Sequence, residues 1–299
     1  MTTASDVRPV TAGSVLGPVR PSGGVWHRVV RDRQAWVGAG LLAGIVLWAL
    51  VGPVLRPWDA THVDLTAFGQ PPSARHWFGT NDIGQDLYQQ VLVGLRKSLV
   101  VALVAAPVAT ALAAVVGAVA GLAGGWVDRA LMAGVDLMLV VPSFYLLVLC
   151  SPALAKAGWP VLALVIAALT WMIMARVVRA QTRSLRDRGF VRAARFAGAP
   201  LGWVVVRHIW PNLASLLVAD VTVGVGAAVL TEATMSYFGI GVRVPDVSLG
   251  TLLAAGGPAA ATRPWLFVCP ALVLVVAVCA VSLLGDALRD ALDTGAGRG

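Results

Sequence analysis

Residues 189–212 read GFVRAARFAGAPLGWVVVRHIWPN, a basic loop that is rich in small residues. Apolar stretches lie on both sides of this loop, at residues 157–175 and 213–240. A helix needs about 20 largely uncharged residues to cross a bilayer. Two such stretches around a charged loop predict a membrane protein built from helices.

The composition of the whole chain supports the same prediction. Hydrophobic residues make up 58% of the 299 residues, and charged residues make up only 13%. Soluble domains carry about 25% charged residues. We therefore expect an all-α membrane protein in which membrane lipid covers much of the surface.

Six stretches are long and apolar enough to span the membrane, and they lie at 36–55, 98–127, 137–155, 157–175, 213–240 and 264–285. The polar residues 1–35 are expected to form a partly disordered N-terminal tail. The rest of the predicted organisation is an outer segment at 56–97, a five-helix core at 98–290 with its loop near 181–212, and a tail at 291–299.

The basic residues predict how the chain lies in the membrane. If the N-terminus is inside, 16 of the 23 Lys and Arg residues are cytoplasmic, eight of them in the central loop. The excess of Lys and Arg in cytoplasmic loops then favours both termini in the cytoplasm, with 56–97 outside. The net charge of +8 is thus interpreted as a topology signal, with no nucleic-acid partner.

The central loop has a pattern that identifies it further. Ala193, Ala194, Gly198, Ile209 and Pro211 stand at the spacing of EAA-x3-G followed by I-x-P. This pattern resembles the coupling loop of ABC importer permeases, in which a short helix seats in a cleft of a separate ATPase. The resemblance implies that the following residues couple the chain to an ATPase: Phe190, Val191, Arg192, Ala193, Ala194, Arg195, Gly198, Ala199, Pro200 and Leu201.

One position of the loop departs from the family pattern. Arg192 stands where the family often has Glu. We therefore hypothesise that the seat of this loop pairs with an acidic patch on the ATPase. Gly198 is expected to supply a turn that residues with side chains would resist.

Three further segments narrow the family. HWFGTNDIGQDLYQQVLVGLRKSL at 76–99 resembles the signature of C-type permeases of the dipeptide/oligopeptide/nickel family, with Gln85 and Gln89 in place of two arginines. TEATMSYFGIGVRVPDVSLGTLL at 231–253 and LLGDALRDALD at 283–293 resemble later segments of the same family. The resemblance implies the six-helix type I permease fold in a bacterial cell membrane.

The same resemblance implies the partners and the cargo. We expect a homologous B-type permease subunit, two ABC ATPase subunits and an extracytoplasmic peptide-binding protein. ATP and Mg would be bound by the ATPase subunits, so this chain is expected to hold no cofactor itself. Peptides are the expected cargo, and nickel or another small solute is the alternative.

Two carboxylates lie inside the predicted span 213–240. Glu232 matches a glutamate of the family and is a candidate to line or gate the pathway; a structural hydrogen bond within the bundle is the alternative. Asp220 is expected to contact an arginine of the coupling loop. A stripe of small residues at 113, 117, 121 and 125 predicts close helix packing, either within this chain or against a second permease.

The sequence contains none of several common catalytic motifs. Neither Lys97 nor Lys156 stands in a G-x4-G-K-[ST] loop, and the four histidines form no HExxH or other metal-binding pattern. No G-x-S-x-G elbow is present either. We therefore expect neither an enzyme nor a metal site, and the sequence argues against a secondary transporter or an intramembrane enzyme.

Overall fold

A computed structural model describes residues 32–55, 59–142, 145, 146, 148, 149, 158–243 and 246–296. Most of the predicted N-terminal tail at 1–35 lies outside these residues. So do most positions between 143 and 157, which belong to the predicted third span.

The described residues form helices and connecting loops, which confirms the all-α prediction. Two isolated bridges, Val63 with Gln85 and Thr80 with Asp86, are the only strand-like pairings among them. In chain order the helices are α2 Arg33–Val51, the 3-10 turn η1 Gly52–Leu55, α3 Leu87–Ala123, α4 Gly125–Val140, α6 Trp159–Thr170, α7 Met172–Arg186, α8 Gly189–Phe196, α9 Leu201–Val204, the π-helical segment η2 Val205–Ile209, α10 Trp210–Tyr237, α11 Leu249–Gly256 and α12 Trp265–Ala296.

Fewer long spans are present in the described residues than the six predicted. Four helices are long and apolar enough to cross a membrane, and a fifth span exists if α6 and α7, which are bent by 49°, count as one. Of the predicted third span at 137–155, residues 137–140 form the end of α4, which begins at Gly125, and most of the remainder lies outside the described residues. The chain turns at Gly124 and Gly125, both with positive φ, rather than after Val127.

Three other boundaries differ from the prediction. Helix α3 begins at Leu87, inside the predicted outer segment, because the carboxylate of Asp86 caps it by accepting from the Gln89 amide at 3.0 Å. Residues 201–237, which include the second half of the coupling loop, run as one apolar helical stretch of 37 residues. Helix α12 continues to Ala296, past the expected end of the core at 290.

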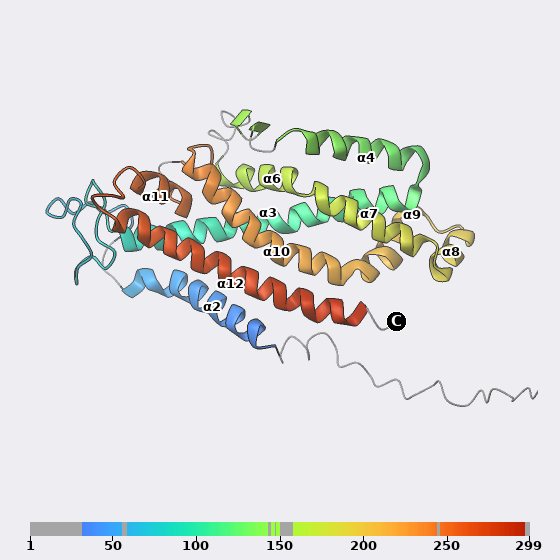
Figure 1. The fold of residues 1–299 in the computed structure, drawn as a ribbon, viewed down its shortest axis with the longest axis horizontal. Helices are drawn as coiled ribbons and strands as arrows, with labels where there is room; N and C mark the ends of the chain where they lie inside the picture. Colours follow the sequence, from blue (N-terminus) through green and yellow to red (C-terminus); the bar gives the residue numbers. More distant parts are fainter. Residues whose placement is uncertain are drawn as a thin grey trace, which may run out of the picture.

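The long helices lie side by side along one axis of the molecule (Figure 1). Helix α3 packs along α7 and α10, while α12 packs against α2 and α10. The outer segment lies at one end with the short helix α11, and α8 lies at the opposite end. The two ends therefore correspond to the two sides of a membrane.

The small-residue stripe is used where α3 meets α7. A Cβ atom built at Gly117 would lie 2.5 Å from the carbonyl oxygen of Ala175, and one at Gly121 would lie 2.8 Å from that of Arg179. Only glycine permits this approach of the two backbones. At these positions the stripe packs within the chain, whereas Gly125 has a positive φ and is the first residue of α4.

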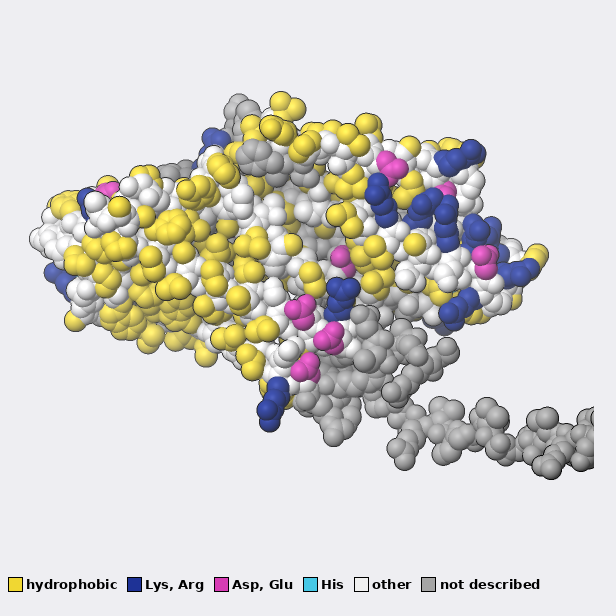
Figure 2. Space-filling model, in the orientation of Figure 1, with side chains coloured by type: hydrophobic (Ala, Val, Ile, Leu, Met, Phe, Trp, Pro, Cys, Tyr) yellow, Lys and Arg dark blue, Asp and Glu magenta, His cyan; other side chains and the backbone are white. Residues whose placement is uncertain are grey.

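The surface is divided by chemistry (Figure 2). Hydrophobic side chains cover most of the length of the face shown, and Lys and Arg gather at the end that carries α8. Large apolar side chains such as Trp36, Leu47, Leu137, Ile173 and Leu272 are more than half exposed on the isolated chain. This surface suits lipid or a second membrane subunit.

Candidate functional site

Helix α8, the centre of the predicted coupling loop, packs on the bundle mainly through one fully buried apolar side chain. Val191 is fully buried and packs in a cluster with Val178 and Leu185 of α7 and Val204 of α9. The neighbouring residues Arg192, Ala193 and Arg195 are exposed. The helix is thus anchored on one side and presents its other side to solvent.

The turn after α8 depends on Gly198. Its φ is +81°, and its amide donates to the carbonyl oxygen of Arg195 at 3.0 Å. No atom lies within 4 Å of a Cβ built there, so the requirement for glycine is conformational rather than steric. Ala199 continues the turn by donating to the carbonyl oxygen of Ala194, and Pro200 stands at the N-cap of α9, which Leu201 begins.

Basic and aromatic groups occur together on the exposed side of this loop. A cavity of about 340 Å³ is lined by Arg186, Asp187, Arg192, Arg195 and Phe196. The Phe196 ring is 84% exposed, which is unusual for a large apolar side chain on a surface that faces only water. This combination is typical of a surface that a protein partner covers.

Contacts between aromatic rings also stabilise the loop. The imidazole of His208 lies 5.7 Å from the ring of Phe190 and 5.2 Å from that of Trp203, measured between centroids. These contacts connect the start of α8 with α9 and η2. The ten predicted coupling residues therefore lie in one continuous unit at the basic end of the molecule.

An ion-pair cluster behind this unit has no counterpart in the sequence-based predictions. Asp128 of α4 is nearly fully buried and pairs with Arg179 and Arg183 of α7. A second bond to Arg179, from its Nη2 to Oδ2 of Asp128, measures 2.8 Å. From the sequence these arginines are only topology signals, because nothing in their spacing indicates a partner 51 or 55 residues away.

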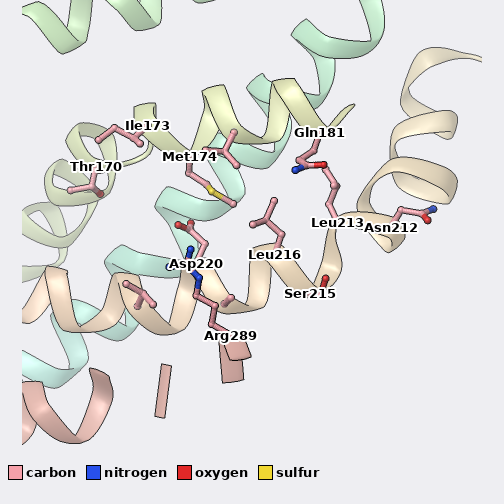
Figure 3. Close-up of a pocket in the computed structure, with 13 residues that line it drawn as sticks. Thr170, Ile173, Met174, Gln181, Asn212, Leu213, Ser215, Leu216, Asp220 and Arg289 are labelled. Atoms are coloured by element: carbon pink, nitrogen blue, oxygen red, sulfur yellow. The ribbon is translucent and has the colours of Figure 1, made fainter. Parts of the chain in front are cut away.

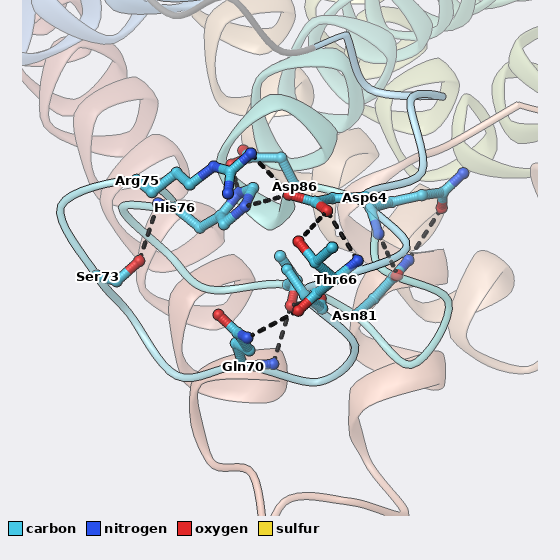
Figure 4. A network of polar contacts seen from close by, with 11 residues as sticks. Asp64, Thr66, Gln70, Ser73, Arg75, His76, Asn81 and Asp86 are labelled. Carbon is cyan, nitrogen blue, oxygen red and sulfur yellow. Dashed lines mark hydrogen bonds and ion pairs between the residues drawn. The ribbon is translucent and has the colours of Figure 1, made fainter.

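At the opposite end, the outer segment folds over a buried histidine (Figure 4). His76 Nδ1 lies 2.8 Å from Oδ2 of Asp86, the residue that caps α3, and His76 Nε2 lies 3.6 Å from Oδ2 of Asp64. Thr66 donates to Asp64 through both its amide and its hydroxyl. These hydrogen bonds from Thr66 are the main reason that the pKa of Asp64 lies below its usual range, and the nearby Arg75 and His76 lower it further.

The signature at 76–99 brings several elements together. Gly94 allows α3 to approach α11, since a Cβ there would lie 2.9 Å from the carbonyl carbon of Ser248. Arg96 donates to the carbonyl oxygens of Ala49 and Leu50 at the end of α2, at 2.6 and 3.0 Å. Cations favour helix C-termini in this way. Much of the motif thus has a structural explanation.

Glu232 lies in the interior of the bundle. It is fully buried, and it accepts from Ser98 of α3 at 2.6 Å and from Ser236 at 2.7 Å. This geometry matches the structural hydrogen bond that the sequence left as an alternative. A role for Glu232 in the pathway or gate stays a prediction.

Asp220 has a different partner from the one expected. Thr110 of α3 donates to its Oδ2 at 2.6 Å, so the bonded neighbour is a hydroxyl and not an arginine of the coupling loop. Asp220 also lines a cavity between α7, α10 and α12, toward which Arg289 of α12 points (Figure 3). Arg289 was expected only to be a cytoplasmic charge.

Together, these features define the class of protein to which the chain belongs. The chain is a multi-pass membrane protein with a polar cap over one end and an exposed, anchored helix at the other.

Comparison with known proteins identifies the family. Residues 113–298 match the binding-protein-dependent transport system inner membrane component, and residues 21–72 match the N-terminal transmembrane domain of oligopeptide transport permease C. The chain belongs to this family of inner-membrane permease components.

Individual relatives agree over most of the chain. The chain is 44% identical over 270 residues to the oligopeptide transport system permease protein OppC of Mycobacterium tuberculosis, covering 90% of this chain and 93% of that protein. A putative peptide permease protein of Brucella suis is 36% identical, with 89% of each chain covered. OppC of Bacillus subtilis is 34% identical, with 88% of this chain and 86% of that protein covered.

Proposed function

We propose that this chain is the C-type permease subunit of an ATP-driven importer and forms half of the pathway for dipeptides or oligopeptides. The observation that carries the proposal is the exposed helix α8, anchored by Val191 and ended by Gly198, in a chain that is 44% identical to an oligopeptide permease. The names of the relatives support peptides over nickel as cargo.

The partners follow from the same reasoning. A second, B-type permease completes the pathway, two ABC ATPases bind beneath, and a peptide-binding protein delivers cargo from outside. ATP and Mg are bound by the ATPases, because no P-loop occurs in this sequence. Both termini and α8 then lie in the cytoplasm, and the cap around His76 lies outside.

The contacts indicate how movement of an ATPase would reach the spans. When the two ATPases close, the α8 helices of both permeases move together. Val191 passes the displacement to α7, which is tied to α4 through Asp128 and to α3 at Gly117 and Gly121. Packed helices shift as units rather than deform, so the displacement opens one side of the bundle and closes the other.

The test is peptide-stimulated ATPase activity and peptide uptake by the complete complex in proteoliposomes. Wild type is compared with Gly198→Val, in which a β-branched residue must adopt a positive φ at a cost of about 1–2 kcal/mol. Gly44→Val is the matched control, because it also places a side chain in open space, but in the regular helix α2.

The expected result is stimulation by peptide in wild type and in the control, and its loss in an assembled Gly198→Val complex. If wild type responds to nickel or another solute instead of peptides, the chain is a permease for that cargo. A Gly198→Val complex that stays fully coupled would show that α8 does not transmit the movement.

A further inference from the structure

A cavity lies between α7, α10 and α12 in the described part of the chain. It encloses about 500 Å³ and opens to the surface. This volume lies within the range of about 300–1,000 Å³ that is usual for small-molecule sites. Apolar side chains, among them Ile173, Met174, Val177 and Leu216, form part of its wall.

Two groups of opposite charge face the same space. Asp220 lies in a largely apolar helical stretch, where an acidic side chain is disfavoured by about 2.5–3.5 kcal/mol on insertion scales. Such residues are kept where they face a partner or a water-filled cavity. Arg289 enters the cavity from α12, and its side chain points toward Asp220 (Figure 3).

Neutral polar groups complete the lining. Gln181 and Ser215 are exposed to this space, and within the described part of the chain their side chains form no hydrogen bonds. Asn212 and Thr170 line the cavity too and donate to carbonyl oxygens four residues before them, those of His208 and Ile166. An amide and a hydroxyl offer donors and acceptors of the kind that peptide bonds need.

We propose that this cavity binds the transported peptide through its main chain and its free termini, as a binding site on the inner part of the pathway. Asp220 faces the terminal ammonium, Arg289 faces the terminal carboxylate, and Gln181 and Ser215 bond the peptide groups between them. This inference rests on the proposed function. Recognition of features common to all peptides, beside apolar walls, would let side chains of different kinds pass.

The chemistry of the lining argues against a metal ion in this cavity. Among the described residues that line the cavity, Asp220 is the only carboxylate and none is a histidine or cysteine. Among the described residues no group of three or more such side chains could hold a metal. The cavity therefore fits a zwitterionic organic solute and not the nickel ion that was the alternative cargo.

The experiment uses the complete purified complex and a tripeptide whose middle side chain carries a diazirine. After illumination, mass spectrometry locates the cross-link, which is expected at wall residues such as Met174 or Leu216. Asp220→Asn should lower cross-linking of the free-amine probe by about tenfold, the equivalent of one lost charge-assisted hydrogen bond, and should barely affect an N-acetylated probe. Arg289→Gln should lower cross-linking of the probe with a free carboxylate and should barely affect a probe with a C-terminal amide.

Two control variants separate binding from structure. Thr110→Val removes the hydrogen bond to Asp220 but keeps its charge, so cross-linking of the free-amine probe should persist. Asp286→Asn removes an exposed charge of α12 outside the cavity and should change nothing. If Asp220→Asn fails to assemble, Asp220→Glu, which keeps the charge, should assemble and cross-link the probe.

The outcomes distinguish this inference from the proposed function. If wild type neither imports peptides nor responds to them with ATPase activity, the proposed function fails. If wild type imports peptides but the probe reacts elsewhere, or reacts equally in the charge variants with free and blocked termini, only the cavity assignment is wrong. A side chain of the second permease could instead occupy the cavity. A diazirine placed at residue 216 would then form a cross-link between the two subunits, and this result would also overturn the cavity assignment.

Discussion

At the scale of single residues, Glu232 shows how polar groups are accommodated in the bundle. Both its oxygens accept from serine hydroxyls, and each serine in turn accepts a backbone amide, that of Leu249 at Ser98 and that of Val242 at Ser236. One carboxylate thus joins α10, α3 and the start of α11. A buried network in which every member has partners specifies one arrangement of its helices.

The serine of α3 in this network can be tested by removal. Ser98→Ala leaves an oxygen of Glu232 and the amide of Leu249 short of a partner in a fully buried place. We expect the free energy of unfolding to fall by about 1–3 kcal/mol. Denaturation of the purified chain in detergent measures this change.

Thr234→Val is the matched control, because this exposed hydroxyl bonds only the carbonyl oxygen of Leu230 in its own helix. It should change the unfolding free energy by a few tenths of a kcal/mol at most. Equal effects of the two substitutions would contradict the role given to the buried network.

Asp64 predicts a dependence of stability on pH. Its pKa is lowered in the folded chain, chiefly by the hydrogen bonds from Thr66, so the folded state binds its proton less readily than the unfolded state does. This contribution to stability is complete above the unfolded pKa of about 4 and is lost as the pH falls through the folded pKa.

The difference in unfolding temperature between wild type and Asp64→Asn in detergent should therefore be the same at pH 7 and at pH 5. The difference should shrink as the pH is lowered below about 4. A difference that already disappears between pH 7 and pH 5 would show that a group other than Asp64 controls the stability of the outer segment.

At the scale of elements, α3 is the helix on which the others are arranged. It contacts α7 and α10 along its length, and its N-terminal end carries the signature that meets α2 and α11. Its glycines fix how closely α7 can lie. The distance between these two helices decides whether movement of α7 is shared by α3.

Gly121→Ala tests this contact. The added methyl group would lie 2.8 Å from the carbonyl oxygen of Arg179 and 2.7 Å from Cβ of Thr182, so the helices must separate. Overpacking of this kind costs about 1–3 kcal/mol. We expect lower thermal stability and weaker coupling of ATPase activity to uptake in the complete complex.

Gly134→Ala is the control for that measurement, because its Cβ meets no atom within 4 Å in the helix α4. Since alanine favours helices over glycine, this variant should be as stable as wild type or slightly more stable. A Gly121→Ala protein that behaves like Gly134→Ala would show that α3 and α7 are not closely packed.

The sequence was sufficient for the helical class and the family, whereas the role of the coupling loop stays a prediction. These depend on local composition and on motifs such as Ala193, Ala194 and Gly198, which can be recognised without knowing the fold. Helix ends were placed less well, since Asp86 begins α3 through a cap inside a polar stretch and Gly124 ends it inside an apolar one. The pairing of Asp128 with Arg179 and the approach of Arg289 to the cavity arise from tertiary packing, which no local pattern encodes.

At the scale of the whole molecule, the polar cap and the basic α8 end lie at opposite ends of an apolar bundle (Figure 2). This distribution predicts a single orientation in the membrane. In a variant without the cysteines at 150, 269 and 279, a cysteine placed at Gly189 should react with a membrane-impermeant maleimide only after the cells are opened. A cysteine placed at Thr61 should react in intact cells whose outer barrier has been made permeable.

Both positions are exposed on the chain, so failure to label would not reflect burial within it. The reverse pattern would place α8 outside and would contradict both the orientation and the coupling to a cytoplasmic ATPase. Labelling of both sites in intact cells would show that the chain has no single orientation.

The π-helical segment η2 lies at the joint between the coupling loop and α10. A π turn spans i to i+5 and so holds one residue more than the α turn it replaces. Moving that surplus along the chain by a turn would rotate the intervening side chains by about 100° while the helix on either side keeps its hydrogen bonds. The segment η2 is thus the place in the stretch 201–237 where α9 could rotate relative to the span that carries Glu232 without unwinding that span.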